Sequence, residues 1–202
     1  MKAETVKRFK SKRNRVSLMD TERGLLVEKV YPDIRNAAKE AAIYDLLRGQ
    51  SLKTPQLIKA EEGRLLLSYM QGTDFLCLLE RQEGTKPDYA PWDKLVDWIL
   101  SFYELTGYAL TDLNLRNFLY DPQSGEVLGL DFEECGPGET GEMIAGLCAY
   151  ILLYHPPYTS AKKQIVQHIQ KYAAERIPCD SALLEEKTAQ AVRSIQERRQ
   201  KR

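Results

Sequence analysis

The sequence is poor in cysteine and histidine, the residue types that many metal sites and nucleophilic active sites require. Among 202 residues there are two histidines and four cysteines, and no two cysteines form a C-x-x-C pair. Neither a zinc site nor a disulfide framework is therefore expected, and a Ser-His-Asp triad has little material to draw on. We expect the cysteines to be reduced packing residues.

The sequence also lacks an excess of charge and a long apolar run. Its 29 basic and 29 acidic side chains give a formal net charge of zero, so bulk charge implies neither a polyanion nor a membrane partner. No apolar run approaches the roughly 20 residues of a membrane-spanning helix, and the first residues hold no apolar signal core. The protein is therefore expected to be cytoplasmic. Its 202 residues, 43% of them hydrophobic, are enough to bury a core and fit one domain or two small lobes.

The most informative stretch covers residues 107–134 and is predicted to contain a β-hairpin. Two apolar runs, 118–120 and 127–130, flank a turn-forming segment at 121–125. Apolar runs of this length around a turn rich in Asp, Pro and Gly are typical of two antiparallel strands. Residues that precede the first strand and residues that follow the second will therefore lie at the same end of the ribbon.

Three polar residues stand next to this predicted hairpin. Asn117 precedes the first strand, Asp131 follows the second, and Asp112 lies five residues before Asn117. Carboxylate and amide oxygens at one end of a hairpin would suit a hard cation such as Mg²⁺. The alternative is that Asp112 and Asn117 only cap turns, as Asp and Asn often do.

A second hairpin is predicted over residues 16–31, and a charged residue lies near its end. By strand alternation Lys29 is expected to face the covered side of the sheet, where a lysine needs an anionic partner. A helix is predicted to begin at Pro32 and Asp33 and to stop at Gly49, with Glu40 in the middle of its apolar stripe. Glu40 is thus the predicted partner, and a surface salt bridge is the alternative.

The rest of the pattern predicts two further strands and then mainly helices. The strands cover 55–60 and 65–72, and the second is apolar enough for the centre of a sheet. Amphipathic or apolar helices are predicted at 74–81, 91–107, 142–154, 160–176 and 181–199. A β-rich part is therefore followed by a helical part.

These features, in this order, resemble the protein-kinase-like superfamily, and most closely its aminoglycoside and choline phosphotransferase branch. In that family a D-x-x-x-x-N catalytic loop is followed by a hairpin and a metal-binding Asp. Asp112 and Asn117 match the loop, and residues 130–133, LDFE, are similar to the branch's variant of D-F-G. Lys29 and Glu40 are similar to the strand lysine that contacts the ATP phosphates and the helix glutamate that holds it.

The resemblance covers residues 14–155 and implies an α+β, two-lobed protein-kinase-like fold. The small β-rich N-lobe would take in residues 1–70, and the helical C-lobe residues 71–202. The implied function is ATP-dependent transfer of the γ-phosphate to a hydroxyl acceptor. ATP and Mg²⁺ are the implied cofactors.

The resemblance also implies a role for each matching residue. Asp112 would accept the proton of the acceptor hydroxyl, while Asn117 and Asp131 would hold Mg²⁺. The strand that ends near Gly72 would lead into the hinge that binds adenine, and its candidate residues are Ser68, Tyr69 and Met70.

Two departures from the family pattern keep other functions open. Residues 11–23 contain no G-x-G-x-x-G, and Leu110 replaces the histidine that usually precedes the catalytic Asp by two residues. A pseudokinase that binds a nucleotide or a partner is the first alternative. An RNA-associated regulator is the second, suggested by basic segments at 7–15 and 196–202, although an edge strand is the favoured explanation of residues 7–15.

The acceptor is expected to be macromolecular or presented by a partner protein. Only about 70 residues follow Asp131, enough for some three helices of ordinary length, whereas small-molecule members of the branch add a long helical subdomain. A free small ligand normally needs a concave site that buries most of its surface. No membrane partner is expected, and nucleic acid is not the favoured acceptor.

Overall fold

The computed structural model describes residues 3–200, and the chain divides into two compact units. The first unit comprises Met1–Gln71 together with Leu128–Glu134, and the second comprises Gly72–Val127 and Cys135–Arg202. Sequence reasoning placed residues 128–134 in the helical lobe. In the structure the Gly129 amide donates a hydrogen bond to the Lys53 carbonyl at 3.2 Å, which ties this segment to the first unit.

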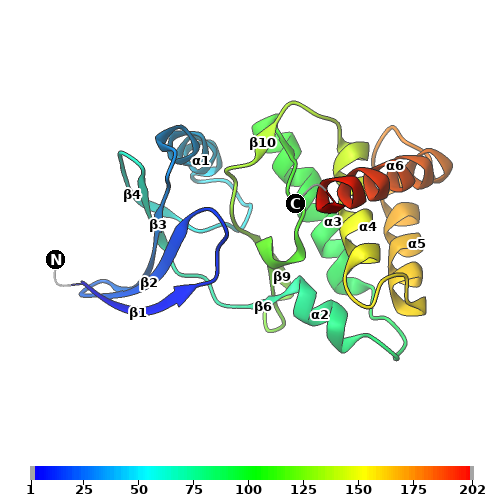
Figure 1. Cartoon of the computed structure of the whole chain (residues 1–202), viewed down its shortest axis with the longest axis horizontal. Coiled ribbons are helices and arrows are strands. Elements are labelled where there is room, and N and C mark those ends of the chain that lie inside the picture. Colours follow the sequence, from blue (N-terminus) through cyan, green and yellow to red (C-terminus); the bar gives the residue numbers. More distant parts are fainter. Residues whose placement is uncertain (1–2, 201–202) are drawn as a thin grey trace. The chain divides into compact units, whose positions relative to one another are not determined.

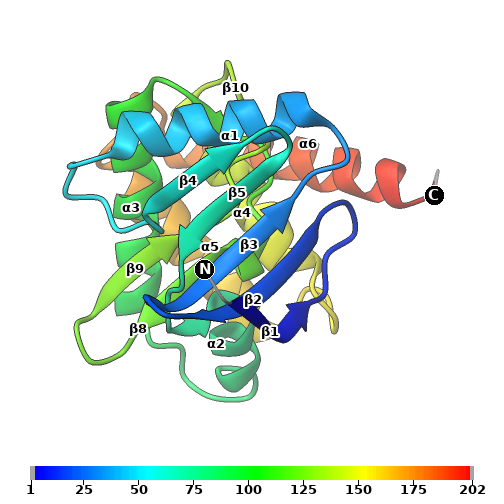
Figure 2. The same ribbon diagram turned by 90° about the vertical axis from the view of Figure 1, so that its left-hand side faces the viewer.

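The first unit is an antiparallel sheet of five strands with one helix (Figure 2). Neighbouring strands pair in the order β1-β2-β3-β5-β4, so β1 is an edge strand. The hairpin predicted at 16–31 is confirmed as β2 and β3, and the glycine of its turn, Gly24, has a positive φ of 92°. The strands are β1 (Ala3–Phe9), β2 (Arg15–Thr21), β3 (Gly24–Val30), β4 (Leu57–Glu61) and β5 (Arg64–Ser68).

The helix of this unit, α1 (Ile34–Leu47), packs against β4 and β5. It begins where the sequence predicted, because the Asp33 carboxylate caps it by accepting a hydrogen bond from the Arg35 amide at 3.0 Å. Its buried face consists of Ala37, Glu40, Ile43, Tyr44 and Leu47. Glu40 is therefore a charged residue inside an otherwise apolar stripe.

The second unit is mainly helical (Figure 1). Its central helix, α4, is apolar almost throughout and packs against α3, α5 and α6. The helices are α2 (Phe75–Arg81), α3 (Ala90–Thr106), α4 (Thr140–Leu153), α5 (Ser160–Ala174) and α6 (Ser181–Gln200). Within residues 3–200, none of the helices has both the length and the apolar character to cross a membrane.

Short strands bracket the segment that carries Asp112. β7 (Ala109–Leu110) pairs with β10 (Cys135–Gly136), and β8 lies between β6 and β9 in a small sheet. The hairpin predicted around the turn at 121–125 is confirmed as β8 and β9. The remaining bounds are β6 (Thr73–Asp74), β8 (Phe118–Asp121), β9 (Glu126–Gly129) and one 3₁₀ turn (Leu115–Asn117).

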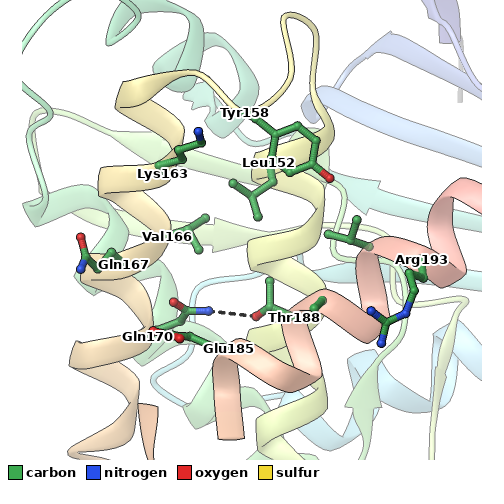
Figure 3. A pocket seen from close by; sticks show the side chains of 11 residues that line it. Leu152, Tyr158, Lys163, Val166, Gln167, Gln170, Glu185, Thr188 and Arg193 are labelled. Carbon is green, nitrogen blue, oxygen red and sulfur yellow. Dashed lines mark hydrogen bonds between the residues drawn. The ribbon is translucent and has the colours of Figure 1, made fainter. Parts of the chain in front are cut away.

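A groove of about 560 Å³ lies among α4, α5 and α6 (Figure 3). Leu152, Val166 and Val192 give it an apolar lining, and at one side Gln170 donates a hydrogen bond to the Thr188 hydroxyl at 3.1 Å. None of the residues that the sequence singled out for catalysis, metal binding or nucleotide binding lines this groove. It is therefore separate from the candidate active site.

The core of the second unit provides a test of the fold itself. Leu95 is fully buried in α3, whereas Leu105 on the same helix is 37% exposed. Leu95→Ala should lower the free energy of unfolding by about 2–5 kcal/mol, because truncation removes buried methyl groups and leaves a cavity. Urea unfolding monitored by tryptophan fluorescence measures this, and Leu105→Ala, the matched control, should cost less than about 1 kcal/mol. Equal losses from the two variants would contradict the burial of α3.

Candidate active site

A buried ion pair between Lys29 and Glu40 is the centre of the first unit. The Lys29 ammonium lies 2.7 Å from Glu40 Oε2, and the two residues are 5% and 0% exposed. Two tyrosines also donate to Glu40, Tyr31 at 2.6 Å and Tyr44 at 3.3 Å. The predicted pairing of Lys29 with Glu40 is thus present, and it is buried rather than superficial.

Burial and neighbouring charges have opposite effects on the pKa values of Lys29 and Glu40. Burial favours the neutral form of Lys29, but the carboxylates of Glu40 and Asp131 oppose it and raise the pKa of the lysine above its ordinary value. Burial also raises the pKa of Glu40, against the effect of the Lys29 charge. Removal of either partner leaves an uncompensated buried charge, which typically costs about 3–5 kcal/mol.

Asp131 binds the same ammonium in a strained backbone conformation. Its Oδ1 lies 2.5 Å from the Lys29 ammonium, and its φ is +64°, in the left-handed region that non-glycine residues rarely adopt. The next residue, Phe132, is fully buried and packs edge-on against the Tyr44 ring at 5.1 Å between centroids. The surrounding contacts thus hold Asp131 in this conformation.

Two residues that sequence reasoning missed, Asn14 and Glu133, join the turn between β1 and β2 to the Asp131 segment. The Asn14 side-chain amide donates to Glu133 Oε2 at 2.6 Å, and both side chains are buried. Glu133 also lies 3.8 Å from the Lys29 ammonium, and Arg13 forms an ion pair with Glu134. Glu133 belongs to the LDFE motif at residues 130–133, which was the signal for it, whereas nothing in the sequence singles out Asn14.

The oxygen atoms of three acidic residues therefore gather around Lys29. Ligand oxygens of Glu40, Asp131 and Glu133 all lie within 4.8 Å of one another. Glu40 and Glu133 are almost inaccessible, while the Asp131 side chain is 39% exposed. Of the three, Asp131 is the accessible one, and a carboxylate oxygen is a ligand type that suits Mg²⁺.

In the second unit, α4 and the residue that follows its end support the loop that carries Asp112. Tyr150 donates to Asp112 Oδ1 at 3.0 Å, and one helical turn later Tyr154 donates to Asn114 Oδ1 at 2.6 Å. The Asn117 side-chain amide donates to the Asp112 carbonyl at 3.3 Å, so its Oδ1 is the atom suited to a cation. Neither tyrosine was a candidate from sequence, because aromatic residues on an apolar helix are typical core residues.

The hinge candidates lie at the end of β5. In the antiparallel register Ser68 is opposite Leu26 of β3, the strand that carries Lys29. The Ser68 amide donates to the Gln56 carbonyl at 2.9 Å, and its hydroxyl accepts from the Gln56 amide at 2.8 Å. Tyr69 and Met70 follow the strand and belong to no helix or strand. Their roles in adenine binding stay predictions.

The structure thus brings together the predicted site residues within each unit. Lys29, Glu40 and Asp131 meet in the first unit, and Asp112 and Asn117 meet in the second. The first group is an ion-paired lysine with an adjacent acid, and the second is a carboxylate loop with an adjacent amide.

Comparison with solved structures identifies the class of fold. No protein-family model and no curated protein matches this sequence. The structure is similar to that of the Rio2 kinase-ADP/Mg²⁺-phosphoaspartate complex from Chaetomium thermophilum, with a TM-score of 0.54, 16% identity and 91% of this chain covered. The chain therefore has a protein-kinase-like fold, as predicted from the sequence, with a small antiparallel sheet in one unit and mainly helices in the other.

A second similar structure is that of Rv3197 from Mycobacterium tuberculosis in complex with erythromycin. Here the TM-score is 0.52 and the identity 13%, and 86% of this chain is covered. In both comparisons this chain spans 60% of the other protein's length. Identities this low establish the fold alone.

Exchanging the partners of the hydrogen bond between Asn14 and Glu133 tests that bond. Asn14→Asp should destabilise the first unit by about 1–3 kcal/mol, because it places a second carboxylate against buried Glu133. Adding Glu133→Gln should recover at least half of this loss, since the introduced glutamine amide donates to the new aspartate. Calorimetric unfolding of the four proteins in this double-mutant cycle measures the coupling. Asn36→Asp on α1 is the control for added charge, and additive effects of the two changes would exclude a direct bond.

The tyrosines that support the Asp112 loop predict a loss of stability at alkaline pH. Burial raises the pKa values of Tyr150 and Tyr154 from 10.0 to about 12. Between these values the unfolded chain releases protons that the folded protein keeps, so stability falls as pH rises through that interval. Tyr150→Phe and Tyr154→Phe should each reduce the drop in unfolding temperature between about pH 9.5 and 11.5. The exposed Tyr108→Phe should leave the drop unchanged, and an equal effect of all three variants would refute the assignment.

Proposed function

We propose that this protein transfers the γ-phosphate of ATP to a hydroxyl group. The observation that carries the proposal is the buried Lys29–Glu40 pair whose lysine also binds Asp131. A lysine with a raised pKa stays cationic and is suited to contact nucleotide phosphates. The kinase-like fold supports the proposal, and so does the similar Rio2 structure, which is a complex with ADP and Mg²⁺.

In the proposed reaction each of the polar site residues has its own role. Lys29 orients the α- and β-phosphates, and Glu40 holds Lys29 in place. Asp131 and Asn117 would hold Mg²⁺, which neutralises charge on the phosphates when bound. In the transfer, the acceptor oxygen bonds to the γ-phosphorus, the bond from that phosphorus to the ADP oxygen breaks, and Asp112 takes the hydroxyl proton. Because Tyr150 donates to Oδ1 of Asp112, Oδ2 is the proposed proton acceptor.

A pseudokinase that binds a nucleotide or partner without catalysis is the second candidate. Two features favour it: residues 11–23 contain no glycine-rich phosphate loop, and Leu110 replaces the usual histidine of the catalytic loop. Retention of Lys29, Asp112 and Asn117 favours an active enzyme. Separate measurements of binding and transfer distinguish the two.

Two variants should separate nucleotide binding from transfer. Mg²⁺-ATP at millimolar concentration should raise the unfolding temperature, because a ligand that binds only the folded state stabilises it. Lys29→Met should abolish that shift, and Lys59→Met, at an exposed position of β4, should keep it. Asp112→Asn should keep the shift but lower transfer, or hydrolysis with water as acceptor, at least about 100-fold.

The outcomes point to different conclusions. No thermal shift with Mg²⁺-ATP in the wild type would refute nucleotide binding. A shift accompanied by equal rates in the wild type and Asp112→Asn would indicate the pseudokinase. Asp20→Asn, at an exposed position of β2, controls for the loss of a carboxylate.

A further inference from the structure

The end of α6 is fixed beside the residues that support the Asp112 loop. Val192 and Ile195 of α6 join Ala149 and Leu153 of α4 in one apolar cluster. One turn after Ile195, the Arg199 guanidinium donates to the Leu153 carbonyl at 3.5 Å. The buried face of α6 thus sets the direction of the arginines that follow it.

Arg198 and Arg199 are consequently close to the two tyrosines that hold the loop. The charge of Arg198 acts on the hydroxyl of Tyr150, whose hydrogen bond goes to Asp112. The charge of Arg199 acts in the same way on Tyr154. In both cases the positive charge lowers the pKa of the tyrosine, against the larger effect of burial.

Arg116 adds a third positive charge from the loop itself. Its amide donates to Asn114 Oδ1 at 3.1 Å, the same atom that accepts from Tyr154. The side chains of Arg116, Arg198 and Arg199 are exposed, and within residues 3–200 none of them forms an ion pair with a carboxylate. In a chain with a formal net charge of zero, one exposed arginine thus lies on the Asp112 loop, and two more stand at the end of α6, where Arg199 contacts the residue before Tyr154.

We propose that the acceptor carries a phosphate group of its own, which Arg116, Arg198 and Arg199 bind while its hydroxyl lies at Asp112. The inference rests on the proposed function and names the substrate class of that site. Guanidinium groups bind phosphate through paired N–H donors and are weakly hydrated, so exposed arginines are suited to this role. The phosphate belongs either to a small phosphorylated sugar or to the backbone of RNA, and both present a free hydroxyl beside a phosphate.

The test compares acceptors that differ in one phosphate group. Ribose 5-phosphate and ribose form the small pair, and a short single-stranded RNA oligonucleotide is the polymeric probe. With radiolabelled ATP, the phosphorylated probe should be used with a kcat/KM at least about tenfold higher than that of ribose. Arg198→Gln combined with Arg199→Gln should raise the KM for that probe about tenfold or more. Arg193→Gln, an exposed arginine earlier on α6, should leave this KM unchanged.

Direct binding measurements test recognition of the acceptor phosphate independently of turnover. Calorimetric titration of the protein with each probe, with ADP and Mg²⁺ present, gives the affinities. If RNA is the source, the slope of log K against log salt concentration should fall by about 2 in the double variant, roughly one for each lost phosphate contact. If ribose 5-phosphate is the source, it should bind more tightly than ribose and lose that advantage in the double variant.

Two results would overturn this inference and leave the proposed function intact. The first is Mg²⁺-ATP binding with no preference for either phosphorylated probe over ribose. The second is a preference that Arg193→Gln reduces as much as the double variant does. Failure of Mg²⁺-ATP to bind the wild type would instead refute the proposed function itself, and this inference with it.

Discussion

The buried charge of Lys29 is the constraint on which the first unit depends. An ammonium group on the covered side of a sheet is stable only next to a carboxylate, and Glu40 supplies one from α1. The pair thus joins the helix to β3, and Asp131 joins the segment 128–134 to both. Any substitution that removes the Lys29 charge leaves buried carboxylates without a cation, so its effect extends beyond one contact.

The same cluster holds more potential negative charge than positive charge. One ammonium is surrounded by the oxygens of Glu40, Asp131 and Glu133, so when all are ionised there are three negative charges against one positive. Nucleotide phosphates would meet repulsion there unless a cation accompanies them. Asp131 is the accessible member of the cluster. In the proposed reaction, a metal ion bound to Asp131 would offset this excess negative charge.

Local sequence patterns predicted the helices and strands, but they did not predict the contacts between residues that are far apart in the sequence. The start of α1 followed from the Asp33 cap, and the inward position of Glu40 followed from helical periodicity. Asn14 and Glu133 are 119 residues apart, and no pattern within either segment indicates their hydrogen bond. The assignment of residues 128–134 to the first unit likewise depends on a tertiary bond, from the Gly129 amide to Lys53.

The two departures from the family pattern do not support a pseudokinase equally strongly. Leu110 is buried and lacks the hydrogen-bonding groups of the usual histidine, but Tyr150 of α4 and Tyr154, which follows the helix, hold the Asp112 loop through their hydroxyls. Loss of that histidine is therefore weak support for a pseudokinase. The missing glycine loop matters more, since the turn between β1 and β2 is joined to the Asp131 segment through Asn14. Because this turn is anchored rather than free to fold over phosphates, nucleotide affinity is the quantity that distinguishes an active enzyme from its alternative.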